Sequence, residues 1–315
     1  MDSDAILTAV NAAESMANTP HKPERSSYRA RKTVEQIIHL IFLLCGIVAV
    51  AFVLLISIYL ILSGLPAIRQ IGLFQFLLGK VWDPTNTTTG AQYGILPFIL
   101  TSVYGTAGAI VIGVPVGLLT AVFLAKVAPP KLAAVIRTAV QLLAGIPSVV
   151  YGLVGMIVLV PAIQKGFNLG SGACLLAAII VLAIMILPLI MRTAEEALMA
   201  VPDSFREGSF GLGAGRLRTV FRIVLPSAMP GILSGVILGI GRIVGETAAL
   251  IFTAGTMAQI PGLLQSGRTL AIHMYVLSGE GLHMNEAYAT AVVLLVVVLL
   301  MNSLSALVAK KLTKK

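Results

Sequence analysis

The chain has 315 residues, of which 57% are hydrophobic and only 11% are charged, and its mean hydropathy is +0.97. Soluble domains carry about 25% charged residues, so this composition excludes a large soluble domain and predicts a protein that crosses a membrane several times. The net charge of +9 does not indicate nucleic-acid binding, because the basic residues are scattered over separate polar segments.

Residues 1–33 are polar, contain Pro20 and Pro23, and show no apolar periodicity. Such a segment cannot bury enough apolar surface to fold, so we predict a disordered cytoplasmic tail. The apolar stretch that follows is too long for the core of a signal peptide, and no small-residue cleavage site comes after it. We therefore expect it to remain as an uncleaved membrane anchor.

A membrane-spanning helix needs about 20 apolar residues. Long apolar stretches predict six spans, at residues of about 34–62, 95–124, 136–162, 172–192, 227–252 and 287–309. The predicted fold class is an all-α integral membrane domain over residues 34–309, followed by a basic cytoplasmic tail at 310–315. In the third span, Gly145 and Pro147 should bend or break the helix.

Lysine and arginine are concentrated in alternate polar segments of the chain. One set of alternate segments, which we expect on the outer side, carries only Arg69, Lys80, Lys165 and Arg268. The other set carries most of the basic residues. Basic residues accumulate on the cytoplasmic side of membrane proteins, so we expect both termini in the cytoplasm. Cys45 and Cys174 fall inside spans, and their spacing predicts neither a disulfide nor a metal site.

Residues 203–226 form a polar, Arg-rich segment between two apolar spans. We expect a short helix from about Asp203 to Leu212 and then a glycine-rich turn that contains Gly213. Charged groups here, such as Arg206 and Glu207, can contact a soluble partner. The alternative, a solvated inner loop, explains the arginines but not the spacing from Glu207 through Gly213 to Pro226.

The glycine-rich turn does not indicate a nucleotide site. The chain contains no GxxxxGK[ST] sequence and no strand–loop–helix context for phosphates. We therefore expect this chain to bind no ATP, to hold no cofactor or metal, and to contain no catalytic residue.

Arg242, Glu246 and Thr247 stand out in the fifth span. A charged residue near the bilayer centre costs about 2.5–3.5 kcal/mol on insertion scales. Residues four apart share a helix face, so Arg242 and Glu246 could form an ion pair that joins helices. Alternatively, Arg242 faces a translocation path and contacts an anion, since a guanidinium suits phosphate, with Glu246 orienting it.

The segment Leu142–Gly155 also offers two interpretations. Pro147 frees a backbone carbonyl, and the hydroxyls of Ser148 and Tyr151 could lie near it. The helix either lines the path, where small residues let helices approach and move, or simply packs against its neighbours.

The spacing in residues 203–226 resembles the docking loop of ABC-importer permeases, which is usually written EAA, three residues, G, nine residues, I-x-LP. Further segments resemble the PstC-type permeases of bacterial phosphate ABC importers: Trp82–Thr85, Tyr93–Thr106, Leu142–Gly155, Val201–Ala214 and Gly241–Thr247. The resemblance covers about residues 75–305. Gly208-Ser209 replace the usual Ala-Ala, and the AALIFTAG that follows Thr247 is closer to the sister PstA-type subunit.

This resemblance implies a MetI-like permease in the bacterial cytoplasmic membrane. It implies pairing with a second, PstA-like permease, two PstB-like ATPases that use ATP and Mg²⁺, and a PstS-like binding protein that delivers phosphate. The match to the family motif would then make Glu207 and Gly213 coupling positions, and Arg242 and Glu246 path candidates. The full set of coupling residues that it implies is Arg206, Glu207, Gly208, Ser209, Gly213, Ile223, Leu225 and Pro226. The alternatives are a PstA-type subunit, an ABC permease for another oxyanion or polar solute, an ion-coupled secondary transporter, or a membrane scaffold.

Overall fold

The computed structural model describes residues 25–88 and 90–313, and its contacts divide the chain into two units, Met1–Ile58 and Tyr59–Lys315. Helix α2 (Arg25–Ile71) contributes to both units. In the first unit, residues 34–58 are helical and their side chains are almost all exposed. A helix that is apolar on all sides belongs in lipid. Residues 1–24 of the predicted tail lie outside the described residues, and the helix begins nine residues before the predicted start of the span at 34.

Six helices in the described part of the chain are long and apolar enough to cross a membrane, which confirms the predicted all-α fold class. They are Val34–Ile71, Leu96–Lys126, Ser148–Gly166, Leu175–Met199, Arg216–Val244 and Met284–Lys311.

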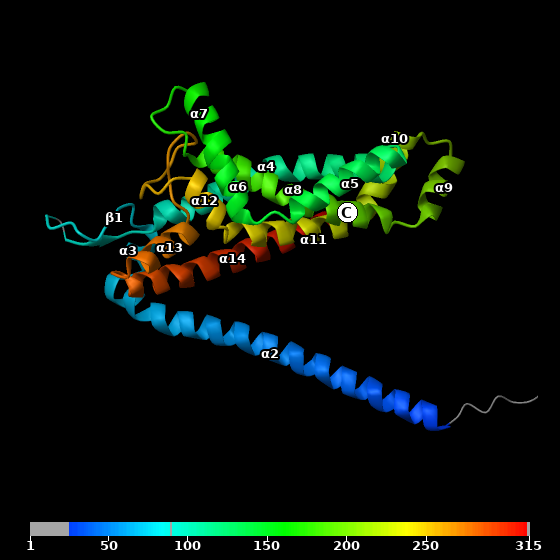
Figure 1. Ribbon diagram of the computed structural model, residues 1–315, viewed down its shortest axis with the longest axis horizontal. Helices are drawn as coiled ribbons and strands as arrows, with labels where there is room; N and C mark the ends of the chain where they lie inside the picture. The colour runs from blue at the N-terminus through cyan, green and yellow to red at the C-terminus, as the bar shows by residue number, and fades with distance from the viewer. Residues whose placement is uncertain (1–24, 89, 314–315) are drawn as a thin grey trace, which may run out of the picture. The chain divides into compact units, whose positions relative to one another are not determined.

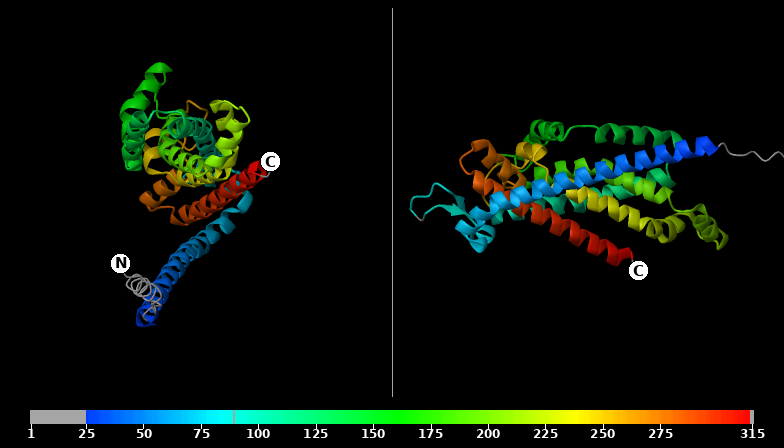
Figure 2. Two further views of the ribbon diagram at one scale, coloured as in Figure 1. Left: turned by 90° about the vertical axis from the view of Figure 1, so that its right-hand side faces the viewer. Right: turned by 90° about the horizontal axis from the view of Figure 1, so that it is seen from below.

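The core of the second unit is the pair α4 (Leu96–Lys126) and α8 (Leu175–Met199), which lie side by side (Figure 1). Glycines on α4 face isoleucines on α8: a Cβ atom on Gly113 would lie 2.7 Å from Ile186 Cδ1. Small residues let helices approach closely where water supplies no driving force. Helix α11 (Leu225–Val244) packs on α8, and α14 (Met284–Thr313) lies along α11 (Figure 2). Lys310 and Lys311 of the predicted tail are in the last turn of α14.

The third predicted span, residues 136–162, is interrupted at Gly145 and Pro147, where the sequence predicted a bend or break, and the helix long enough to cross a membrane begins at Ser148. Helix α5 (Pro130–Ala144) ends before a turn at residues 145–147, and α6 (Ser148–Val154), the π-helix η1 (Gly155–Leu159) and α7 (Val160–Gly166) follow. Pro147 disfavours helical backbone at the residue before it, which explains the break at the expected position.

The fifth span is interrupted as well, although no break was predicted there. Helix α10 (Arg216–Thr219), the π-helix η2 (Val220–Val224) and α11 run continuously to Val244. Residues 245–247 are not helical, and α12 (Ala248–Thr253) follows. The predicted span over 227–252 is therefore two helices.

The second unit has two distinct ends (Figure 1). One end carries α9 (Asp203–Gly211) and α10. The other carries α3 (Leu73–Leu78), the antiparallel pair β1 (Trp82–Asp83) and β2 (Gln92–Tyr93), and α13 (Leu270–Glu280). Trp82 pairs with Tyr93 and Asp83 with Gln92. The charge distribution of the sequence predicts that the α9 end faces the cytoplasm and the α13 end the outer side.

Candidate functional site

The breaks in the third and fifth spans are coupled by close contact between α6 and α12. A Cβ atom on Gly152 of α6 would lie 2.7 Å from Ala249 Cα and 2.9 Å from the Phe252 ring. Gly155, the first residue of η1, also faces α12, because a Cβ atom there would lie 2.7 Å from the side-chain Cγ2 of Thr253. The two short helices therefore pack backbone to backbone, directly beyond the breaks at 145–147 and 245–247.

We expect Gly152→Val to destabilise the protein, because the side chain has no space against the α12 backbone. Overpacking of this kind costs about 1–3 kcal/mol or more. The thermal midpoint of the detergent-purified protein, followed by size-exclusion chromatography, should fall by several degrees. Gly166→Val is the matched control, since no atom lies within 4 Å of a Cβ at that position. Equal midpoints for the two variants would contradict the packing described here.

Tyr151 bridges the break in the third span. Its hydroxyl donates a hydrogen bond of 2.7 Å to the carbonyl oxygen of Leu143, which also accepts from the Ile146 N–H at 3.1 Å. The hydroxyl of Tyr151 thus does approach a carbonyl at the break, as the sequence suggested. Ser148 is half-buried in the first turn of α6 and forms no side-chain hydrogen bond with the described residues.

Glu246 and Thr247 form the turn between α11 and α12. The Glu246 carboxylate accepts a hydrogen bond of 3.1 Å from the Ala249 N–H and so caps the start of α12. Thr247 Oγ1 donates to the Gly245 carbonyl at 3.3 Å. Among the described residues, Glu246 forms no ion pair with Arg242. The predicted contact between the two side chains fails because the helix ends at Val244, which removes the four-residue spacing of one helix face.

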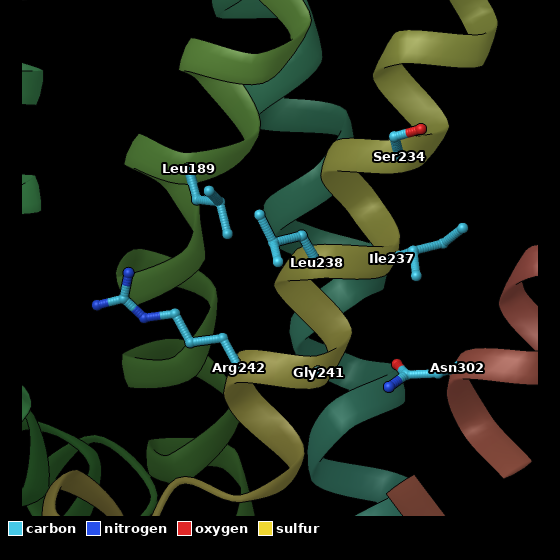
Figure 3. Close-up of a pocket in the computed structure, with 7 residues that line it drawn as sticks. All are labelled: Leu189, Ser234, Ile237, Leu238, Gly241, Arg242 and Asn302. Carbon is cyan, nitrogen blue, oxygen red and sulfur yellow. The ribbon is translucent and has the colours of Figure 1, made fainter. Parts of the chain in front are cut away.

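Arg242 lies in the last turn of α11, where its positive charge is favourable at the helix C-terminus. It borders an open groove of about 550 Å³ whose other lining residues are Leu189, Ser234, Ile237, Leu238, Gly241 and Asn302. Figure 3 shows the guanidinium extending away from Asn302. Within the described part of the chain, Arg242 is exposed and has no hydrogen bond or ion pair, so its donors are available beside the break at 245–247.

The second candidate region is the predicted docking loop. Helix α9 covers Asp203–Gly211, close to the predicted helix, and none of its residues is buried. Arg206 pairs with Asp203 at 2.9 Å within the helix, and Glu207 is exposed. Gly213 has a φ of +80°, a left-handed conformation that favours glycine, so the tight turn was predicted correctly.

The loop is held to the membrane domain by its second half. Ser209 Oγ lies 2.9 Å from Thr219 Oγ1, and Thr219 is buried. Val220 and Val224 of η2 pack with Leu198 at the end of α8. Ile223 is in the same π-helix, and Leu225 and Pro226 begin α11. These contacts connect α9 with α8 and α11.

The sequence reasoning missed the exposed apolar side chains of this loop. Leu212 is 91% exposed and Leu217 is 66% exposed, and Phe205 and Phe221 are each about half exposed. Exposed apolar side chains therefore lie beside the charged residues of this loop. The charges and the glycine spacing of this segment did not indicate these apolar residues, which stand among its arginines.

Comparisons with known proteins agree with this arrangement. Residues 113–314 match the model of the family described as "Binding-protein-dependent transport system inner membrane component". The chain is 37% identical over 219 residues to the probable ABC transporter permease protein YqgH of Bacillus subtilis, covering 69% of this chain and 70% of that protein. It is 35% identical over 293 residues to the phosphate transport system permease protein PstC of Xylella fastidiosa, covering 84% and 86%.

A solved structure of the MetNI methionine ABC transporter in an inward-facing conformation shares the fold. Its TM-score is 0.53 at 21% sequence identity, and the match covers 70% of this chain and 94% of that one.

Proposed function

Because the chain belongs to the binding-protein-dependent transport system inner membrane component family and is an ABC importer permease subunit, we propose that its cargo is inorganic phosphate and that it is the PstC-type subunit. The observation that carries the proposal is Arg242, whose guanidinium is exposed beside the helix break at 245–247 and forms an ion pair with no carboxylate in the described residues. A planar fork of N–H donors suits a phosphate oxyanion. The PstC relative, similar over most of both chains, supports the same cargo.

In the proposed mechanism, a PstB-like ATPase uses ATP and Mg²⁺, while this chain catalyses no reaction and binds no cofactor. The ATPase grips the docking loop at Glu207, Leu212 and the neighbouring exposed residues. Closure of the ATPase pair moves α9, and η2 and α11 follow because Thr219 and Val224 anchor the loop in the core. Such domain motions take microseconds to milliseconds.

The breaks in the third and fifth spans are where this motion can change the path. Residues 145–147 and 245–247 are the non-helical links in their spans, so they can absorb backbone rotation while α6 and α12 stay packed. Arg242 lies immediately before the second break and Tyr151 just after the first. In this proposal both termini lie in the cytoplasm, and a PstS-like protein delivers phosphate to the outer end beside a PstA-like partner.

A permease for another oxyanion is the second candidate, because the YqgH relative is named as a probable ABC permease without a cargo. A guanidinium also binds sulfate or molybdate, so Arg242 does not separate these anions.

Uptake of labelled phosphate separates the two candidates. A strain that lacks this gene should lose high-affinity phosphate uptake, and the wild-type gene should restore it. Unlabelled phosphate should compete with the label, whereas sulfate, molybdate and amino acids should not. Uptake that is unchanged in the deletion strain, or competition by sulfate as strong as that by phosphate, would contradict phosphate as the cargo.

A further inference from the structure

A second arginine, Arg268, has surroundings that differ from those of an ordinary surface residue. It lies in the segment between α12 and α13, at the end of the second unit opposite α9 (Figure 1). Its side chain is half-buried, and the guanidinium carbon is 5.5 Å from the centroid of the Phe98 ring. Arg268 Nε donates to the Thr256 carbonyl at 2.9 Å, which fixes the plane of the guanidinium.

The other neighbour of Arg268 is His273, which is fully buried. Phe98 stacks on the imidazole at 3.9 Å, and Trp82 meets it edge-on at 4.2 Å between ring centroids. Burial, with the nearby Arg268 charge, lowers the pKa of His273 to about 2. The imidazole is therefore neutral at physiological pH, and its Nδ1 can accept a hydrogen bond from Arg268 Nη1 at 3.3 Å. Arg268 supplies the positive charge of this cluster.

No carboxylate among the described residues forms an ion pair with Arg268. Burial lowers the pKa of Arg268. The negative charge of Glu280, which is exposed, acts in the opposite direction and raises this pKa without forming an ion pair. A guanidinium has five N–H donors and stays protonated, and Nε and Nη1 account for the hydrogen bonds that it makes with the described residues. A partly desolvated cation is costly unless an anion compensates it.

We propose that Arg268 is an oxyanion-binding residue at the outer end of the permease, which contacts phosphate before it reaches Arg242. Thr256, Phe98 and His273 hold the guanidinium rigidly, so its remaining N–H groups form a preorganised fork. The identification of the anion as phosphate rests on the proposed function, whereas the geometry of the site is independent of it. The oxyanion could also be a carboxylate of a docked binding protein, and the experiment separates the two.

The test uses the complete complex in proteoliposomes, with the phosphate-loaded binding protein outside and ATP inside. Arg268→Gln should lower the initial rate of phosphate uptake at least about tenfold, while the complex assembles and binds the binding protein normally. Arg268→Lys should show an intermediate rate, because lysine keeps the charge but loses the fork. The matched control is Arg69→Gln, an exposed arginine at the same side of the membrane by charge distribution, and it should transport normally.

Wild-type rates for Arg268→Gln would overturn the inference. If that variant does not assemble, Arg268→Lys decides alone, and a wild-type rate for it would overturn the inference equally. Loss of binding-protein affinity in an assembled variant would assign the site to a carboxylate of that protein and would also overturn it. No uptake by the wild-type complex contradicts the proposed function instead, and with it the assignment of phosphate to Arg268.

Discussion

Replacing Arg242 by alanine is expected to lower the rate of phosphate uptake by about 10- to 100-fold while the complex still assembles. A hydrogen bond to a charged group contributes about 1.5–3 kcal/mol. Arg242 has no hydrogen-bond or ion-pair partner among the described residues, so its replacement leaves no internal group unpaired. Arg242→Lys should recover only part of the rate, because an ammonium cannot bind an oxyanion in two places at once. The measurement is uptake of labelled phosphate by variants whose assembly is checked by size-exclusion chromatography.

Ser234→Ala is a suitable control for Arg242, since Ser234 lies on the same helix and lines the same groove. Its hydroxyl donates to the Pro230 carbonyl of its own helix, so its loss should leave the rate unchanged. A wild-type uptake rate for an assembled Arg242→Ala complex would remove Arg242 from the path.

Glu207→Lys should reduce the amount of ATPase that co-purifies with the permease to less than about a tenth, and uptake should fall with it. Glu207 is exposed on α9 and forms no ion pair among the described residues. Its replacement therefore changes the docking surface without removing an internal contact. The charge reversal also places another cation beside Arg206, which a partner suited to the native loop should not tolerate.

The matched control for Glu207 is Lys131→Glu, which reverses a charge on the same side of the membrane outside the docking loop. Membrane insertion of both variants should equal that of the wild type. Unchanged co-purification for Glu207→Lys would show that residues 203–226 do not couple this chain to an ATPase.

The spans were predictable because length and apolar composition decide whether a helix crosses lipid. The break at Gly145 and Pro147 was predictable as well, since proline limits the backbone before it. The break after Val244 was not predictable, because Gly245 followed by Glu246 is also compatible with a continuous helix. Only the structure shows that the Glu246 carboxylate caps the start of α12. The turn at 245–247 therefore separates Arg242 from Glu246, with which an ion pair was one of the two interpretations.

Arg268 could not be identified from the sequence at all. In the sequence it is one basic residue in an outer segment without a motif, and nothing near it in the chain predicts burial. Its surroundings come from Phe98 in α4 and from His273 and Thr256, so tertiary contacts alone identify it. Leu212 was missed for a different reason, because the charges and the glycine spacing of the docking loop do not indicate the apolar residues among its arginines.

The most direct test of an ATP-driven phosphate permease is uptake by the purified complex in proteoliposomes, with the loaded binding protein outside. Labelled phosphate should accumulate when ATP is enclosed, and omission of ATP or the Glu207→Lys change should abolish it. Accumulation without ATP or without an ATPase subunit would contradict the account and favour an ion-coupled transporter.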